Sequence, residues 1–304
     1  MREVIPVMHC FDKNYVIPVA VSFYSMLSNA SKEYDYVFYV LHSDIHIELQ
    51  KRLEITISSF NNARLVFIDT KDFFVDIFEK LPNKAHYSKE MFFKLFTPEF
   101  FPDINRLIIT DVDVVFLGDI SSTYCAGNNT EYYVEGCKGL VRKGSEIEKF
   151  MSVYDNNFTA SEIEICKGVG AGYVIFNLEL MRKDNIVEQF LNCTLSNIER
   201  LIQPEQDVMN LVCYPKIKCL PANTMICSYS YAMYSEYSGI DEDINFSSEE
   251  VKFALQNPIQ LHYAGPAKPW NRPHSALSLI WYQYLFKTPF ADDFLRIMDE
   301  KFRS

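Results

Sequence analysis

Apolar segments with the length of buried strands alternate with helix-like segments over the first part of this chain. The sequence predicts strands at 4–8, 36–41, 64–68 and 106–110, and helices at 16–27, 45–57 and 89–96, the last ending before Pro98. Such alternation predicts an α/β fold whose parallel sheet carries helices on both faces. Ligands of these sheets bind outside the carboxyl ends of the strands, at a topological switch point. The residues after each predicted strand are therefore the first candidates for a functional site.

Two acidic residues, Asp111 and Asp113, directly follow the apolar run 106–110. Side chains at i and i+2 of an extended strand point to the same side, so these carboxylates are expected to converge and to require a cation between them. A hard divalent ion fits, and such ions are often completed by substrate phosphates. Short Asp-x-Asp strings also occur in surface turns, so the pair alone indicates no more than a candidate metal–diphosphate site.

A second group of polar residues follows another short apolar run near the C-terminus. His262 ends that run, and imidazole is a good metal ligand beside carboxylates. Gly265 would let a phosphate approach the backbone, and Lys268 would supply positive charge. Taken alone, a histidine here is more often a core residue and a lysine more often solvated.

The composition argues against nucleic-acid binding and against a secreted or membrane-spanning protein. The net charge is −11 and no basic stripe offsets it, which argues against nucleic acid as a partner. The 8 cysteines show neither a C-x-x-C pair nor zinc-ligand spacing, as is typical of a reducing compartment. No signal-like N-terminal segment and no long apolar run occur, so we expect a cytoplasmic protein.

The second half of the chain is less regular. Strands are predicted at 131–135, 173–177, 216–220 and 259–263, with a helix from 178 to 182. Because no linker rich in Pro, Gly or Ser divides the chain, we expect one domain over residues 1–274 and a helical extension over 275–304. Trp281, Tyr282, Tyr284 and Phe286 cluster in this extension. A docked terminal helix would explain them, and so would an anchor on a membrane surface.

The two polar motifs together resemble glycosyltransferase family 8. That family combines a strand-terminal Asp-x-Asp with a late His-x-x-Gly-x-x-Lys-Pro-Trp, and the chain is similar to bacterial lipopolysaccharide α-galactosyl- and α-glucosyltransferases. The resemblance implies a GT-A fold, a mixed sheet flanked by helices. It also implies that Mn²⁺ or Mg²⁺ bridges the diphosphate of a UDP-sugar. The residues that carry the motifs are Asp111, Val112, Asp113, His262, Gly265, Lys268, Pro269 and Trp270.

The resemblance also implies a role for each of these positions. Asp111, Asp113 and His262 would hold the metal ion, with Val112 between the two acids in the donor site. Gly265 and Lys268 would contact the diphosphate.

Further positions match the family's donor site. The turn after the first strand resembles a uridine-binding turn, in which Asp12 and Asn14 would hydrogen-bond to uracil and ribose and Tyr15 would stack on the base. The alternative for this turn is an ordinary strand–helix junction with Asp12 as an N-cap. His86 would line the donor site, and Lys94 stands where many members carry an arginine that faces the donor.

On the sugar side, Gln206 would lie near the β-face of the donor sugar and Asp207 beside the transferred sugar. A neutral amide is a poor nucleophile, so attack on the front face, assisted by the leaving phosphate, is favoured over double displacement. The string Gly170-Ala171-Gly172 departs from the Asn-Ala-Gly of the family, which leaves the identity of the sugar open.

The function implied is retaining transfer of galactose or glucose from a UDP-hexose to a hydroxyl of a lipopolysaccharide, glycolipid or glycoprotein. The enzyme would be cytoplasmic, with peripheral contact at the inner face of the membrane through the C-terminal helix as a further expectation. The alternatives are a UDP-sugar hydrolase, a self-glucosylating enzyme, for which 19 tyrosines are available, and a non-catalytic partner-binding module. The oligomeric state is open.

Overall fold

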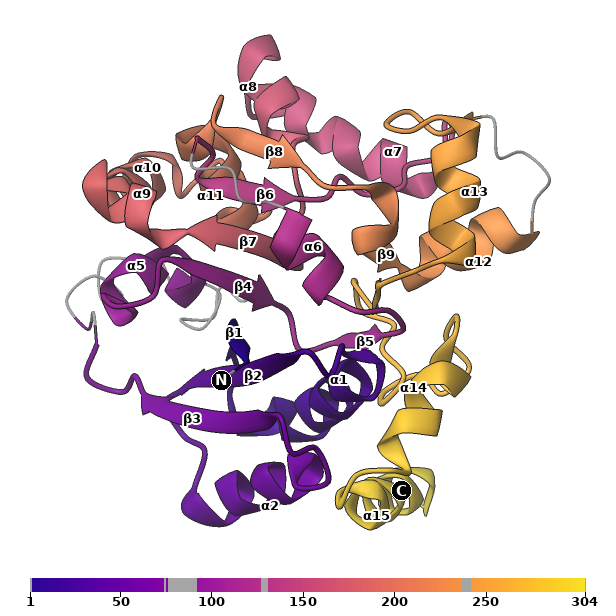
Figure 1. Ribbon diagram of the computed structural model, residues 1–304. Coiled ribbons are helices and arrows are strands. Elements are labelled where there is room, and N and C mark those ends of the chain that lie inside the picture. The colour runs from indigo at the N-terminus through magenta and orange to yellow at the C-terminus, as the bar shows by residue number, and fades with distance from the viewer. Residues whose placement is uncertain (1, 74, 76–91, 127–130, 237–241, 304) are drawn as a thin grey trace.

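A seven-stranded mixed sheet forms the centre of the molecule, with the strand order β3-β2-β1-β4-β7-β6-β8 (Figure 1). A second, three-stranded sheet has the order β5-β10-β9. The structure is a computed structural model that describes residues 2–73, 75, 92–126, 131–236 and 242–303. The strands are β1 Glu3–Cys10, β2 Tyr34–His42, β3 Ala63–Asp69, β4 Arg106–Thr110, β5 Val114–Phe116, β6 Val134–Gly136, β7 Tyr173–Asn177, β8 Ile217–Cys219, β9 Ile226–Cys227 and β10 Gln260–His262.

Helices flank the large sheet on both faces. The α-helices are α1 Val16–Asn29, α2 Ile47–Ile57, α5 Thr97–Phe100, α6 Ser121–Ala126, α7 Glu146–Met151, α8 Ala160–Cys166, α9 Leu178–Lys183, α10 Ile186–Asn197, α11 Pro204–Cys213, α12 Ser228–Glu236, α13 Ser248–Gln256, α14 Ser278–Leu285 and α15 Ala291–Arg303. Short 3₁₀ turns are η1 Lys13–Tyr15, η2 Lys94–Phe96, η3 Ser152–Asn156 and η4 Ala222–Thr224.

The predicted alternation is confirmed in the first half of the chain. Strands β3, β2, β1 and β4 are mutually parallel, and the sheet becomes mixed because β7 joins β4 antiparallel. Successive side chains of a strand point to opposite faces. On β4, Ile108 therefore packs in the core under α1 and α2, whereas Leu107 and Ile109 pack in the core under α9, α10 and α11. Each core is apolar, which is why these strands read as continuous apolar runs.

Most predicted boundaries lie within two residues of the observed ones, and two regions differ more. The helix expected to end before Pro98 ends at Phe96 as the 3₁₀ turn η2, but a separate helix, α5, begins directly at Thr97. Pro98 lies in the first turn of α5, where the missing N–H costs no hydrogen bond. The strand expected at 131–135 starts later, at Val134. Residues 89–91 of that predicted helix lie outside the described part of the chain.

The C-terminal segment is helical, as predicted, and packs on the N-terminal half. Trp281 is fully buried, and Tyr284 Oη accepts a hydrogen bond of 3.1 Å from Asn29 Nδ2. Arg52 of α2 donates to the Pro289 carbonyl at 2.7 Å. The docked-helix interpretation therefore holds for α14, while the domain boundary at residue 274 stays a prediction. None of the helices in the described part of the chain has the length and apolar character needed to span a bilayer.

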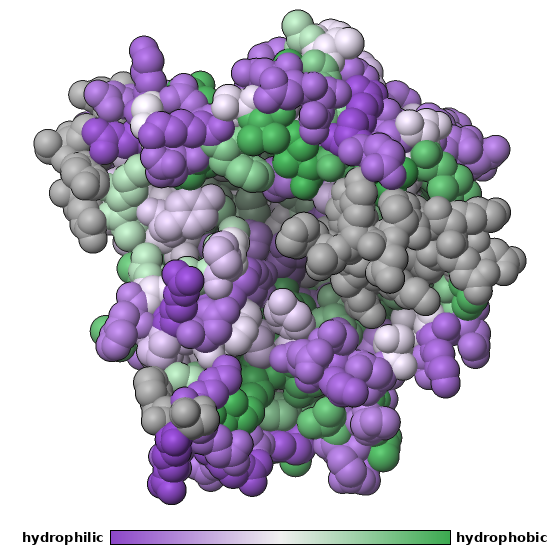
Figure 2. Space-filling view, turned by 180° about the vertical axis from the view of Figure 1, so that it is seen from behind, coloured by the Kyte–Doolittle hydropathy of each residue, from purple (hydrophilic) through white to green (hydrophobic). Residues whose placement is uncertain are grey.

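None of the 8 cysteines, all of which lie in the described part of the chain, forms a disulfide bond. The face opposite to that of Figure 1 carries mostly hydrophilic residues, with apolar ones in separate patches (Figure 2).

Candidate active site

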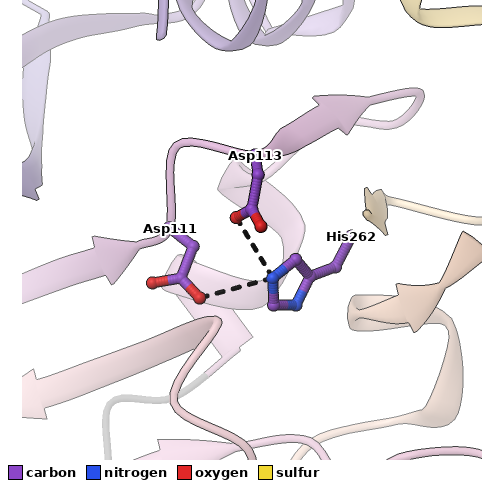
Figure 3. A group of neighbouring side chains, drawn as sticks. All are labelled: Asp111, Asp113 and His262. Atoms are coloured by element: carbon purple, nitrogen blue, oxygen red, sulfur yellow. Dashed lines mark ion pairs between the residues drawn. The ribbon is translucent and has the colours of Figure 1, made fainter. Parts of the chain in front are cut away.

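The two acidic residues and His262 meet where the two sheets join. Strand β4 ends at Thr110, the chain bends at 111–113, and β5 then pairs antiparallel with β10 so that Val114 lies opposite His262. The Tyr263 N–H donates to the Asp113 carbonyl at 2.9 Å and fixes this register. The backbone is bent here rather than extended, yet both carboxylates still converge on the imidazole (Figure 3).

The donor atoms of this triad have the spacing that a divalent ion requires. His262 Nε2 lies 3.4 Å from Asp111 Oδ2 and 3.2 Å from Asp113 Oδ1. One ligand atom from each residue lies within 4.8 Å of the other two. Neighbouring ligands of an octahedral ion with bonds of about 2.1 Å are about 3 Å apart. Two carboxylates and one imidazole therefore fit a divalent metal ion.

In each of Asp111 and Asp113, a lysine contacts the carboxylate oxygen that is not the one nearest to His262. Lys268 Nζ donates to Asp113 Oδ2 and, at 2.7 Å, to the carbonyl of Tyr263. Lys94 Nζ, from η2, donates to Asp111 Oδ1 and, at 3.3 Å, to the carbonyl of Ala171. Both ammonium groups lie on side chains that are mostly buried. The carboxylate oxygens that face His262 are thus the ones left for a metal ion.

Neighbouring charged groups shift the pKa values of Asp113, His262 and Lys94. Burial alone would raise the pKa of Asp113, but His262 and Lys268 lower it well below its usual range. Burial would lower the pKa of His262, but Asp113 and Asp111 raise it above its ordinary value. Burial also opposes the charge on Lys94, whose pKa is nevertheless raised by Asp111 and Glu205. A proton and a metal ion would therefore compete for His262 Nε2.

A buried glutamine ties the two sheets together beneath the triad. Gln260 Nε2 donates to Thr110 Oγ1 at 2.7 Å and to the Gly172 carbonyl at 3.3 Å. The same carbonyl accepts from Thr110 Oγ1 at 3.1 Å and from the Asp111 N–H at 3.2 Å. Sequence reasoning missed this network. The available signal was that Gln260 precedes His262 by two residues on one strand, which places both side chains on the same face.

Two glycines of the loop before β7 leave space for other side chains. A Cβ on Gly172 would lie 2.7 Å from His262 Nδ1, so any larger residue would push the imidazole away. A Cβ on Gly170 would lie 2.8 Å from Met225 Cε. Met225 Cε is the flexible end of a side chain that can shift, so packing at position 170 does not explain the departure from Asn-Ala-Gly.

The first turn of α11 brings Glu205 and Gln206 to the same region. Gln206 Oε1 accepts from the Ala171 N–H at 3.1 Å. Glu205 Oε1 lies 3.9 Å from Lys94 Nζ, and Glu205 Oε2 is buried with no hydrogen-bond partner among the described residues. Burial raises the pKa of Glu205.

Asp207 lies elsewhere. It is fully buried and accepts hydrogen bonds from Tyr154 Oη at 2.6 Å and from the N–H groups of Ile202 and Gln203 at 2.8 and 2.9 Å. These contacts hold the start of α11. That Asp207 neighbours the transferred sugar stays a prediction.

Comparison with known proteins identifies the family of this chain. A family model described as Glycosyl transferase family 8 matches residues 6–273. The chain belongs to glycosyl transferase family 8.

The resemblance inferred from the motifs is therefore confirmed. Membership of family 8 indicates a retaining glycosyltransferase that uses a nucleotide sugar and a divalent metal ion. The neighbouring structures likewise bear out the GT-A fold.

Relatives from several bacteria resemble the chain over most of its length. General stress protein A of Bacillus subtilis is 25% identical over 273 residues, which cover 88% of each chain. Lipopolysaccharide 1,2-glucosyltransferase of Escherichia coli K12 is 25% identical over 304 residues, which cover 96% of this chain and 80% of the relative. The crystal structure of the galactosyltransferase LgtC, with donor and acceptor sugar analogues, superposes with a TM-score of 0.68 at 17% identity. It covers 94% of this chain and 96% of LgtC.

In the turn that the family 8 resemblance assigns to uridine, the side chain of Asp12 is the N-cap of η1. Asp12 accepts from the Asn14 N–H at 2.8 Å and from Asn14 Nδ2 at 3.1 Å, which caps η1. Tyr15 is 38% exposed and stands edge-on to Trp270, with 6.2 Å between ring centroids. Because β1 and β4 are adjacent and parallel, this turn lies at the same edge of the sheet as Asp111.

The remaining family 8 positions have distinct surroundings. Gly265 has a φ of +80° and open space beyond its Cα, which suits the approach of a ligand to the backbone. The side chain of Val112 packs into the core, so only its backbone can face a donor. His86 lies outside the described residues.

Proposed function

We propose that this chain transfers galactose or glucose from a UDP-hexose to an acceptor hydroxyl, with Mn²⁺ as the ion and with retention of the α configuration. The observation that carries the proposal is the convergence of Asp111, Asp113 and His262 beside Lys268. The acceptor we propose is a bacterial lipopolysaccharide, glycolipid or glycoprotein. Its support is the name of the Escherichia coli relative, a lipopolysaccharide 1,2-glucosyltransferase.

In this proposal, Asp111, Asp113 and His262 hold the ion, and Lys268 together with the backbone at Gly265 contacts the diphosphate. Asp12, Asn14 and Tyr15 hold the uridine, and Lys94 and His86 line the donor site. The bound ion supplies a Lewis acid that stabilises the charge of the leaving UDP.

The reaction exchanges one bond for another at the anomeric carbon. The bond from the anomeric carbon to the β-phosphate oxygen breaks, and the acceptor hydroxyl oxygen bonds to the same face. The hydroxyl proton passes to the leaving phosphate oxygen, whose charge Lys268 stabilises. The amide oxygen of Gln206 would stabilise the oxocarbenium-like carbon, as carboxylates do in glycoside cleavage.

The donor can be identified by ligand-induced stabilisation. A bound ligand raises the melting temperature by mass action, so the true donor should give the largest shift. UDP-Gal, UDP-Glc, UDP-GalNAc and UDP-GlcNAc are compared in Mn²⁺, with EDTA as the control. Equal shifts without metal would contradict the proposed role of the ion.

The proposed roles of Lys268 and Gln206 can be separated. Lys268→Ala should weaken UDP binding and slow turnover by about 10²–10³-fold, because an electrostatic contact to the leaving group is lost. Gln206→Ala should lower kcat with nearly unchanged UDP affinity, since its contact matters as positive charge develops. Calorimetric titration of UDP measures this difference. Equal loss of UDP affinity in both variants would remove Gln206 from the sugar side.

The alternative functions have their own signatures. Release of UDP without an acceptor would indicate a hydrolase. Added hexose units on the protein, measured by mass spectrometry after incubation with UDP-glucose, would indicate self-glucosylation. Absence of both, together with absence of UDP binding, would indicate a partner-binding module.

Peripheral contact with the inner face of the membrane through the C-terminal helix is also part of the proposal. On α15, Leu295 and Ile297 are 50% and 40% exposed, and Lys301 and Arg303 are exposed in its last turn. Acidic residues of the same helix oppose binding to anionic lipids. Co-sedimentation with anionic vesicles tests this, with Leu295→Ser/Ile297→Ser expected to reduce binding. Equal sedimentation of the variant would contradict it.

A further inference from the structure

A pocket on the protein surface plays no part in the proposed mechanism. Its volume is about 520 Å³, within the range of roughly 300–1,000 Å³ that is typical of small-molecule sites. Its walls are α7, η3, the end of α8, the loop after β6 and residues 244–245, and α7 and α8 lie at the top of the view in Figure 1. None of the described residues that line it belongs to the proposed donor site. The pocket is thus a second candidate binding site.

The loop before β7 connects this pocket to the sugar end of the proposed donor site. Lys167 lines the pocket at the start of this loop, and Gly172 lies against His262 at its end. Between them, the Ala171 N–H donates to Gln206 Oε1 at 3.1 Å. The four residues from Lys167 to Ala171 span at most about 14 Å. A ligand of a few sugar rings would therefore reach from the pocket to the region of Gln206.

The charged side chains that line the pocket balance one another. They are Lys138, Lys149, Lys167, Glu148, Asp155 and Glu164. An anion would meet three carboxylates here, and a cation would meet three ammonium groups. A ligand with hydroxyl groups suits both, because a hydroxyl donates to a carboxylate and accepts from an ammonium group. The lining therefore favours an uncharged ligand that is rich in hydroxyl groups.

Several polar groups of the pocket are available to such a ligand. The side chains of Lys138, which is partly buried, and of Glu164, which is exposed, have no hydrogen-bond or ion-pair partner among the described residues. Lys167 Nζ lies 3.8 Å from Asp155 Oδ1, too far for a direct hydrogen bond, so that a hydroxyl group fits as a bridge between them. Asn245 uses its Nδ2 to donate to the Gly139 carbonyl at 2.9 Å, which leaves its Oδ1 to accept.

We infer that this pocket binds a neutral oligosaccharide, the part of the acceptor that lies behind the reacting hydroxyl. The acceptor is consequently a glycan chain of several rings, and neither a single sugar nor a tyrosine of the protein itself fills the site. This inference rests on the proposed transfer to an acceptor hydroxyl, and it adds the chemical class of the acceptor.

Filling the pocket tests whether a glycan occupies it. Ser152 is an exposed residue of η3 that lines the pocket, and Ser152→Trp would place an indole ring in it. Val153→Trp is the matched control, because it adds the same ring at the next residue, which is 42% exposed and does not line the pocket. Thermal melting shows whether both variants are folded.

Removing one charged group tests the chemistry of the pocket. Lys138→Met keeps most of the length of the side chain and removes its ammonium group. We expect glycan binding to weaken by about tenfold, as the loss of one hydrogen bond from a charged group would cause. Lys143→Met is the control, since Lys143 is an exposed lysine of the same loop that does not line the pocket.

An array of immobilised neutral and acidic oligosaccharides of increasing length measures binding without turnover, both with UDP and Mn²⁺ and without them. The native protein should bind neutral glycans of three or more rings more tightly than single sugars. Ser152→Trp should bind these longer glycans about tenfold or more weakly, because an occupied pocket loses several contacts at once. Calorimetry should give the same UDP affinity in Mn²⁺ for the native protein and all four variants.

Three results would overturn the inference. They are the absence of binding to any neutral glycan, binding to acidic glycans alone, and equal glycan binding by each variant and its control. A native protein that binds no UDP in Mn²⁺ would instead contradict the proposed function. Because glycan binding is also measured without UDP, the two failures can be told apart.

Discussion

Individual residues of the triad have little freedom in this structure. Each carboxylate shares its oxygens between a lysine and the imidazole, so replacing one member changes the charge balance of the whole group. Substitutions that keep the shape and remove a single charge or ligand atom are therefore the most informative.

At Asp113, we expect Asp113→Asn to abolish transfer and to weaken UDP binding in Mn²⁺. An amide binds a hard cation less well than a carboxylate does. Turnover and calorimetry measure the two effects. Asp103→Asn, at an exposed position before β4, is the control. Full activity of Asp113→Asn, or of the native enzyme in excess EDTA, would contradict the metal assignment.

At His262, replacement by alanine should cause a loss of similar severity, because one of the three proposed ligands disappears. His274→Ala removes an exposed histidine twelve residues further along and should have little effect. Mn²⁺ affinity and turnover of the two variants are compared. Losses of equal size would show that the late motif has no special role.

At the scale of elements, the site depends on two sheets meeting at a fixed separation. Gln260 on β10 and Thr110 on β4 share the Gly172 carbonyl at the start of β7, so a small shift between the sheets would move His262 relative to Asp111. Residues that support metal ligands in this way typically change metal affinity by about 10–100-fold when replaced.

The close approach of Gly172, directly before β7, to the imidazole can be tested directly. In Gly172→Ala the new Cβ would lie 2.7 Å from His262 Nδ1, so we expect Mn²⁺–UDP affinity to fall by about 10–100-fold. Gly139→Ala is the matched control, because a Cβ there would meet no atom within 4 Å. Calorimetry gives the affinities, and a Gly172→Ala variant that binds like the control would show that the contact is not restrictive.

At the scale of the whole molecule, a line of aromatic rings joins Tyr15, in the proposed uridine-binding turn, to the C-terminal helices. Trp270 of the late motif stands 6.2 Å from Tyr15 and 5.6 Å from Trp281, whose ring is in turn 5.5 Å from Phe294 of α15. The C-terminal segment therefore supports the loop that carries Lys268.

Removing the centre of this line should destabilise the fold. Trp281 is fully buried, so Trp281→Ala should lower the free energy of unfolding by about 3–5 kcal/mol. Phe286→Ala, in the next turn and 55% exposed, should change it by about 0.5 kcal/mol or less. Denaturant unfolding measures both. Equal effects would mean that α14 does not dock as described.

The local sequence pattern was sufficient to predict many strands and the candidate metal ligands of this protein. The strands at 106–110 and 173–177 were predicted with their observed bounds, and Asp111, Asp113 and His262 were recognised as ligand types at strand ends. Apolar periodicity depends on residues a few positions apart, so the sequence carries it directly. The spacing of the two motifs likewise identified the family from the sequence alone.

The contacts that complete the site depend on residues far apart in the chain. Gln260 meets Thr110 across 150 positions and Lys268 meets Asp113 across 155, and no periodicity encodes such pairs. The contact of Asp207 with Tyr154 in the core could not be predicted either, because only tertiary packing brings the two together, while its place beside the transferred sugar stays a prediction. The sequence thus determined which chemical groups are present, whereas the junction of the two sheets decided which of them meet, because only folding brings distant strands within hydrogen-bonding distance.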